Sequence, residues 1–173
     1  MQELEIEKRF LIPVEKLDQI KSFIIPESQV HMNDIYIPNG ESHKTLRLRQ
    51  KGEKYMATRK CPVRDGDLTT MLETTIDLSK FEFDALFYGV DSNVEKDRFL
   101  VDISEWRGEL DIFTGRHAGL AVVEFEFQNQ ADLADFEQNA KLDLVDITNL
   151  EWLAGGRLAE IDAETLAKNL KQL

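Results

Sequence analysis

The fold is decided by the stretch Glu3-Leu4-Glu5-Ile6-Glu7-Lys8-Arg9-Phe10-Leu11-Ile12. Successive side chains of a β-strand point to opposite faces, so the three glutamates share one face with Arg9, while Leu4, Ile6 and Phe10 share the other with Lys8. An alternating strand normally buries its apolar face and leaves its polar face in water. The pattern also fits a strand whose polar face lines an enclosed site, and the rest of the chain must decide between the two.

Length and composition favour one domain that spans residues 1–173 and is large enough to bury a hydrophobic core. No apolar run reaches the roughly 18 residues that a membrane-spanning helix needs, so we expect no membrane partner. No signal or transit peptide is visible. The one cysteine, Cys61, rules out an internal disulfide and suits a reducing compartment. We therefore expect a cytoplasmic protein.

The net charge of −12, from 33 acidic and 21 basic residues, argues against a nucleic-acid partner, because non-specific binding to nucleic acid needs a basic surface. It does not exclude a small anion, provided that the basic residues are gathered in one place. The charge says nothing about the oligomeric state, for which a homodimer is one option.

The alternation of the first stretch returns along the chain. Turn signals and three amphipathic helices, beginning near Pro13, Ser79 and Asp132, separate the later alternating segments, and a final helix begins at Asp162. About eight strands with a few inserted helices predict an α+β, mainly β fold: an eight-stranded antiparallel barrel, closed into a tunnel, with helices packed on its outer face. The expected strands are segments 3–12, 33–37, 45–51, 55–60, 71–77, 95–102, 109–113 and 120–127.

Several common sites are excluded by the absence of their motifs. No G-x-x-x-x-G-K-[ST] or G-x-G-x-x-G sequence is present, so neither a P-loop nor a dinucleotide fold is supported. No G-x-S-x-G elbow supplies a nucleophile for acyl transfer. His31, His43 and His117 are scattered without metal-ligand spacing and are expected on the surface or in loops. Gly155-Gly156 is interpreted as a flexible loop.

Like charges repeat at alternate positions on several of these strands. Each strand alone is best explained as a solvated face with cross-strand ion pairs, but like charges side by side destabilise a sheet unless something compensates them. An enclosed site would do so, since carboxylates hold Mg²⁺ or Mn²⁺ and Arg/Lys clusters hold phosphate oxygens. The repeated pairs are Glu5/Glu7, Glu124/Glu126, Arg47/Arg49 and Lys96/Arg98, with Glu73, Arg9 and Lys60 as single charges.

The opening strand resembles the N-terminal E-x-E-x-K signature of the CYTH, or triphosphate tunnel metalloenzyme, superfamily. The resemblance continues in the family's order through Leu46–Arg49, Thr58–Lys60, Glu73, Lys96–Arg98, Leu110–Phe113 and Val123–Glu126. It implies an eight-stranded tunnel with metal-dependent activity on a triphosphate. By this resemblance the catalytic, metal-holding residues are Glu5, Glu7, Glu124 and Glu126, assisted by Glu73 as a further metal ligand, and the triphosphate-binding residues are Arg9, Arg47, Arg49, Lys60, Lys96 and Arg98.

The chain departs from the family pattern at three places. Arg9 replaces the motif lysine and can still bind phosphate, through two donors instead of one. Thr75 follows Glu73 where many members carry a second glutamate, which leaves one fewer carboxylate for a second metal. Trp152 replaces a tyrosine of a C-terminal motif. Asp111 also falls in a family-like stretch, either as support for a site residue or as the partner of an arginine.

The predicted function is hydrolysis of a triphosphate, with inorganic triphosphate favoured because no aromatic stretch marks a pocket for a nucleobase or for thiamine. Mg²⁺ or Mn²⁺ is the expected cofactor. Three alternatives stay open at this point: a class IV type adenylyl cyclase, a non-catalytic module that binds phosphate compounds, and a barrel that carries an apolar ligand with its charges outside.

Overall fold

Strand β1 (Gln2–Leu11) closes the sheet by pairing along both of its edges. The computed structural model describes residues 2–38, 45–64, 68–87, 90 and 92–173. The first half of β1 runs antiparallel to β5 (Thr70–Leu78), and the second half runs antiparallel to β8 (Ala121–Phe127). The opening stretch of the sequence is therefore the strand that turns a sheet into a barrel.

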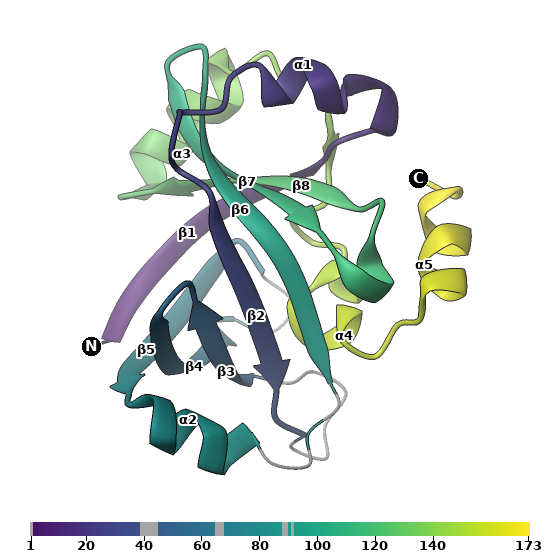
Figure 1. Ribbon diagram of the computed structural model, residues 1–173. Helices are drawn as coiled ribbons and strands as arrows, with labels where there is room; N and C mark the ends of the chain where they lie inside the picture. Colours follow the sequence, from purple (N-terminus) through teal and green to yellow (C-terminus); the bar gives the residue numbers. More distant parts are fainter. Residues whose placement is uncertain (1, 39–44, 65–67, 88–89, 91) are drawn as a thin grey trace.

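The predicted eight-stranded antiparallel barrel is confirmed (Figure 1). Its strands follow the order β5-β4-β3-β2-β6-β7-β8-β1, and the pairing of β1 with β5 completes the ring. The short strand β9 (Val145–Asp146) pairs with the end of β1 and adds a ninth strand to the sheet. The remaining strands are β2 (Val30–Tyr36), β3 (Leu46–Lys51), β4 (Lys54–Pro62), β6 (Asn93–Ile103) and β7 (Trp106–Phe113).

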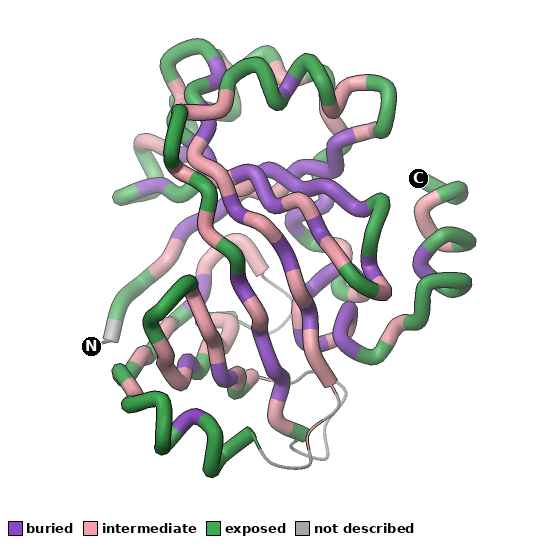
Figure 2. Tube along the Cα trace, viewed as in Figure 1, coloured by how far each residue is buried: buried purple, intermediate pink, exposed green. Residues whose placement is uncertain are grey.

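The apolar faces of the strands lie outside the barrel and are covered by helices. On β1, β6, β7 and β8 the outward residues form a core with α3 (Gln130–Asn139) and α1 (Leu17–Lys21), in which Phe136 contacts the rings of Phe10 and Phe125. Figure 2 shows this buried band along the strands beneath the exposed helix surfaces. The barrel thus has its main apolar packing outside and its polar faces inside.

Helix α2 (Lys80–Phe87) covers the outer faces of β2, β3 and β4 with Phe83, which packs against Ile35 and Leu48. A capping box fixes the start of this helix. The backbone nitrogen of Ser79 donates to Glu82 Oε2 at 2.8 Å, and the Glu82 backbone nitrogen donates to Ser79 Oγ at 3.2 Å. The helix predicted to begin near Ser79 is confirmed.

The C-terminal segment closes one end of the barrel. Leu153 and Leu158 pack against Tyr36, Val94 and other residues of the barrel wall, and this cluster is apolar where the middle of the tunnel is charged. Among the described residues, no helix is long and apolar enough to cross a membrane. The remaining helices are η1 (Val14–Lys16), η2 (Gly115–His117), η3 (Glu151–Leu153), α4 (Gly155–Leu158) and α5 (Ala163–Leu170).

The prediction that all three histidines lie on the surface or in loops is wrong for the burial of His117, which is 1% exposed. Its Nε2 donates to the backbone carbonyls of Leu158, at 2.8 Å, and Ile161, at 3.2 Å. Burial lowers the pKa of His117, so the ring is neutral near pH 7 and holds the C-terminal helices against the barrel. His31 pairs with Asp97 in solvent, and His43 lies outside the described residues.

Candidate functional site

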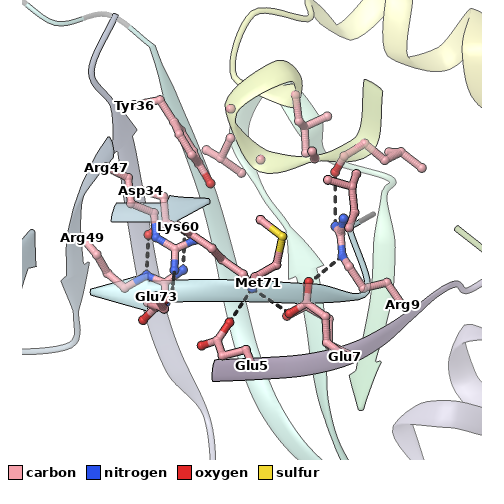
Figure 3. Close-up of a pocket in the computed structure, with 18 of the residues that line it drawn as sticks. Glu5, Glu7, Arg9, Asp34, Tyr36, Arg47, Arg49, Lys60, Met71 and Glu73 are labelled. Atoms are coloured by element: carbon pink, nitrogen blue, oxygen red, sulfur yellow. Dashed lines mark hydrogen bonds and ion pairs between the residues drawn. The ribbon is translucent and has the colours of Figure 1, made fainter. Parts of the chain in front are cut away.

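Every strand of the barrel contributes at least one side chain to an internal pocket with a volume of about 140 Å³ (Figure 3). Two of these residues, Arg49 and Glu73, also line a second cavity that opens beside Glu3 and Asp77. The pocket therefore continues as a tunnel toward the end opposite α4. All of the site residues predicted from the sequence line the pocket: Glu5, Glu7, Arg9, Arg47, Arg49, Lys60, Glu73, Lys96, Arg98, Glu124 and Glu126.

The placement of these side chains excludes one of the alternative functions, a barrel that carries an apolar ligand. The side chains of Arg47 and Arg49 are only 14% and 13% exposed, and both line the pocket. A barrel that carries an apolar ligand would place these charges outside. The structure excludes that alternative, because the polar faces of the strands point inward.

Lys60 connects the two glutamates of the opening strand. Its Nζ lies 2.6 Å from Glu5 Oε2 and donates a hydrogen bond of 2.7 Å to Glu7 Oε2. Burial lowers the pKa of Lys60, but the charges of Glu7 and Glu5 outweigh that effect and raise it overall. Despite this contact, Glu5 Oε2 is buried without a well-aligned hydrogen bond among the described residues. One oxygen of the acidic pair is thus incompletely satisfied.

Glu124 on β8 is held by two arginines from opposite sides. Arg9 donates through Nε to Oε1 at 3.0 Å, and Arg98 donates through Nη2 to Oε2 at 2.7 Å. Burial opposes ionisation of Glu124, but the charges of Arg98, Lys96 and Arg9 outweigh it and hold the pKa well below its usual range. Arg9 also donates to the Leu153 carbonyl at 3.2 Å, which ties the closed end of the barrel to the charged centre.

Asp111 lies directly behind the basic pair of β6 and is fully buried. It accepts two hydrogen bonds from Arg98, of 2.6 and 2.7 Å, and a close contact from Lys96. The β6–β7 register produces this arrangement, because Arg98 stands opposite Asp111 on the neighbouring strand. Burial and the adjacent Arg98 lower the pKa of Lys96, although Asp111 opposes that change. Asp111 meets both sequence-based expectations, because the arginine with which it pairs is itself one of the predicted site residues.

Asp34 on β2 performs the same task for the arginines of β3. It accepts from Arg49 Nε at 2.6 Å and from Arg49 Nη2 at 2.7 Å, a two-point contact that fixes the guanidinium plane. Burial disfavours its charged form, but Arg49 and Arg47 outweigh this and lower the pKa of Asp34. Beside it, the Nε of Arg47 is buried without a hydrogen-bond partner among the described residues. That nitrogen is a donor available to a bound anion.

Glu126 differs from the other acids of the pocket, because in the part of the chain that the structure describes it has no ion-pair partner. Partial burial and the charges of Glu109, Glu5, Glu124 and Glu7 raise its pKa to about 7. It stands directly opposite Glu7 across the β1–β8 ladder, an arrangement that destabilises a sheet unless a cation lies between the carboxylates. Glu126 is therefore the carboxylate whose surroundings most favour a bound cation.

The donor set fits a hard divalent metal, although it is not gathered into a finished cage. Glu5, Glu7, Glu124 and Glu126 supply carboxylate oxygens, which Mg²⁺ and Mn²⁺ prefer. Within residues 2–38, 45–64, 68–87, 90 and 92–173, no three His, Cys, Asp or Glu side chains already converge as a metal site. Lys60 and Arg9 occupy the positions between these carboxylates, so a metal would have to displace their contacts.

Solved structures share this fold. One crystal structure of inorganic triphosphatase NE1496 is 25% identical to this chain, with a TM-score of 0.57. The alignment covers 90% of this chain and 93% of the NE1496 chain. A second crystal structure of NE1496 is 26% identical, with a TM-score of 0.59. Both structures share the barrel fold of this chain. The chain has the CYTH-type fold.

Two further solved structures are less similar in sequence, and their similarity to this chain extends only to the fold. A candidate adenylate cyclase from Bacillus halodurans is 18% identical over 83% of this chain and 93% of that one, with a TM-score of 0.62. A candidate adenylyl cyclase from Hippeastrum, described as having a dominant triphosphatase activity, is 12% identical to this chain, with a TM-score of 0.50. The alignment covers 81% of this chain and 86% of the Hippeastrum chain. No family model matches the chain. No curated protein matches it.

Sequence reasoning missed two residues of the CYTH-type tunnel that carried a readable signal. Asp34 and Tyr36 alternate with apolar neighbours on β2, which places both on the inner face, but neither has a like charge at i+2 to draw attention. Glu109 was also missed. It contacts Arg98 and stands opposite Glu124, a relation that follows only from the β7–β8 register.

The interpretation of Gly155-Gly156 as a flexible loop is wrong. Gly155 begins α4, and a Cβ at this position would lie 1.9 Å from Tyr36 Oη. The glycine is required because the backbone approaches the tyrosine side chain closely. No pattern within the segment could show this, since the contact joins residues far apart in the sequence.

The pairs of like charges are compensated within the protein. Lys60 lies between Glu5 and Glu7, Asp34 grips Arg49, and Asp111 separates the charges on β6. Cross-strand neighbours of opposite charge supply most of this compensation, as expected for each strand taken alone. The exceptions are Glu126 and the unsatisfied nitrogen of Arg47, and they mark where a ligand has most to offer.

Proposed function

We propose that this chain is a metal-dependent phosphoric-anhydride hydrolase that acts on inorganic triphosphate. The observation that carries the proposal is the ring of basic side chains around one internal pocket. Such a ring can contact a linear triphosphate along its length, and the free Nε–H of Arg47 adds an unused donor. The ring consists of Arg9, Arg47, Arg49, Lys60, Lys96 and Arg98.

The resemblance to NE1496 supports hydrolysis as the reaction class, since that protein is an inorganic triphosphatase of the same fold. The pocket supports a compact substrate. Its closed end is lined by Leu153, Leu158 and Val94, which offer no hydrogen bonds to a ribose or a nucleobase. The side chains of Phe113 and Tyr36 are packed in the apolar cluster there, and are not free to stack on a ring.

The candidate metal ligands are Glu5, Glu7, Glu124 and Glu126, with Glu73 as the fifth carboxylate predicted from the sequence. Bound Mg²⁺ or Mn²⁺ would supply charge neutralisation for the phosphoryl oxygens. The cation that binds there would also remove the repulsion between Glu7 and Glu126. Metal dependence is part of the proposal and is tested with it.

The residues of the chain carry out the remaining steps. The basic ring binds and aligns the triphosphate, and the fixed guanidinium planes of Arg49 and Arg98 hold it straight for in-line displacement. A water oxygen forms the new bond to the terminal phosphorus, and the bond from that phosphorus to its bridging oxygen breaks. Pyrophosphate leaves with the electron pair. A pocket carboxylate that the metal does not engage accepts the proton of the water.

The test is a panel of tripolyphosphate, thiamine triphosphate and ATP, each with Mg²⁺, Mn²⁺ or EDTA, with products followed by ³¹P NMR. The proposal expects orthophosphate and pyrophosphate from tripolyphosphate, only with metal, and faster than any release from the two organic triphosphates. Cyclic AMP and pyrophosphate from ATP would favour a cyclase instead. Tight binding of tripolyphosphate without turnover would favour a non-catalytic module.

A further inference from the structure

Glu73 accepts one hydrogen bond from a guanidinium and one from a hydroxyl, whereas Glu124 accepts from two guanidinium groups. Glu73 Oε2 accepts from Arg47 Nη2 at 3.3 Å, and Glu73 Oε1 accepts from Thr75 Oγ at 2.9 Å. Both oxygens are therefore already engaged. Figure 3 shows Glu73 on the side of Arg47 and Arg49, whereas Glu5 and Glu7 share Lys60.

A second hydroxyl fixes the direction of this chain of hydrogen bonds. Thr75 Oγ lies 2.9 Å from Thr58 Oγ, which is 1% exposed. Each hydroxyl has one proton, so Thr75 can donate to Glu73 only if it accepts from Thr58. The strand register places the three partners side by side, with Arg47 opposite Thr58 and Thr58 opposite Thr75. The contacts are set by the sheet and not by flexible side chains.

We propose that Glu73 is a positioning residue for the substrate-binding Arg47, held by Thr75 and Thr58, and not a ligand of the metal. Each oxygen of Glu73 keeps a second lone pair, but a cation there would compete with the guanidinium of Arg47 for the same charge. The i+2 neighbour of Glu73 on its strand is the hydroxyl of Thr75, whereas Glu5 with Glu7 and Glu124 with Glu126 supply two carboxylates at alternate positions. The Nε of Arg47 is the one donor of its guanidinium that is buried and unsatisfied among the described residues, and Glu73 orients it within the pocket. The metal then depends only on Glu5, Glu7, Glu124 and Glu126.

This inference gives a role to Thr75, the position where the chain departs from the family pattern of two alternating glutamates. A second carboxylate there would repel Glu73 and would offer another oxygen ligand. A hydroxyl instead donates to Glu73 and fixes the position of its carboxylate. The inference rests on the proposed function, because it assumes that Arg47 contacts the triphosphate.

The test separates metal binding from substrate binding. Mn²⁺ is titrated into the substrate-free protein by calorimetry, and KM and kcat for tripolyphosphate are measured for the same variants. Glu73→Gln should bind Mn²⁺ with the affinity and stoichiometry of wild type, within twofold, while its KM rises about tenfold or more with little change in kcat. Glu7→Gln should lose Mn²⁺ affinity.

The conservative variant keeps the test independent of folding. Thr75→Val removes the hydrogen bond to the Glu73 carboxylate and the one shared with Thr58, and should raise KM about fivefold. Thr75→Ser, which keeps the hydroxyl, should restore it. Thr74→Val, on the exposed outer face of the same strand, is the matched control and should leave KM unchanged.

The inference would be overturned, and the proposed function left intact, if Glu73→Gln bound Mn²⁺ ten times more weakly than wild type or bound one Mn²⁺ ion fewer. A normal KM in Thr75→Val would also overturn it. A wild-type protein that binds neither Mn²⁺ nor tripolyphosphate would overturn the proposed function, and the inference with it.

Discussion

We predict that Asp111→Asn is the most destabilising single-charge change in the tunnel wall. The substitution keeps the size of the side chain and removes its negative charge. Asp111 is fully buried and is bonded to Arg98 twice and to Lys96 once. In the variant, two buried cations on the same strand lose their shared counter-charge.

The magnitude follows from the burial of the pair. Arg98 keeps Glu109 and Glu124, but Lys96 has no other ion-pair partner among the described residues. The exposed fractions of the Lys96 and Asp111 side chains are 8% and 1%, so solvent cannot replace the lost interaction. Removing one partner of such a buried ion pair costs about 3–5 kcal/mol. For a chain of this length each kcal/mol lowers Tm by roughly 2–4 °C, so Tm should fall by roughly 6–20 °C.

The same hairpin contains a matched control. Asp102 stands opposite Arg107 on β6 and β7, as Arg98 stands opposite Asp111, and it also makes two hydrogen bonds to the arginine, of 2.9 and 3.1 Å. The side chains of Asp102 and Arg107 are both exposed, and exposed ion pairs add little to stability. Asp102→Asn should therefore have the same free energy of unfolding as wild type.

Urea denaturation at pH 7.5, followed by circular dichroism and tryptophan fluorescence, measures both variants. The change in the free energy of unfolding should be large for Asp111→Asn and near zero for Asp102→Asn, with an unchanged m-value. If Asp111→Asn unfolds within 1 kcal/mol of wild type, the view of Asp111 as the counter-charge of the β6 bases is refuted.

Three further predictions follow. Gly155→Ala should destabilise the closed end of the barrel because its Cβ would meet Tyr36 Oη at 1.9 Å, and Tyr36→Ala in the same chain should recover part of the loss in Tm. Burial lowers the pKa of His117 in the folded state, so the unfolded state binds the proton more tightly. The free energy of unfolding of wild type should therefore decrease as the pH falls from 6.5 through the folded-state pKa. Urea titrations at pH 5 and pH 8 should show a smaller difference in this free energy for His117→Gln than for wild type. Arg49→Lys cannot reproduce the two-point contact with Asp34, so it should raise KM for tripolyphosphate and lower kcat; normal kinetics would remove Arg49 from the substrate site.

The sequence predicts the barrel because its strands alternate so regularly. The first strand places its glutamates on one face and Ile6 and Phe10 on the other, and the structure confirms that the apolar face packs under a helix. The capping box at Ser79 predicts the start of α2 through a local hydrogen-bond pattern. These features depend on neighbours within a few residues, which is why they can be read without a structure.

The interior of the site was predicted less completely, because its contacts depend on register. Which charge faces which is set by the pairing of strands that lie far apart in the sequence, such as Glu7 with Glu126 and Arg98 with Asp111. A shift of one residue would reverse every inward face. The burial of His117 and the contact of Gly155 with Tyr36 likewise depend on the docking of the C-terminal helices.

The outer surface differs in one respect from the predicted arrangement. Helices cover much of the outside of the barrel, but Leu4, Leu72 and Ile76 on β1 and β5 remain exposed, at 56%, 38% and 58%. Leu4 and Leu72 are direct cross-strand partners, so their apolar contact is made within the sheet. A homodimer remains a prediction.

The central claim is that the charged interior binds and hydrolyses a metal–triphosphate complex, and is not only a network of ion pairs. The most direct measurement is orthophosphate release from tripolyphosphate by wild type and by Glu124→Gln, each with Mg²⁺, Mn²⁺ or EDTA, with folding checked by circular dichroism. The account predicts metal-dependent release by wild type and none by the folded variant. Equal release by both proteins, or release that EDTA does not reduce, would contradict it.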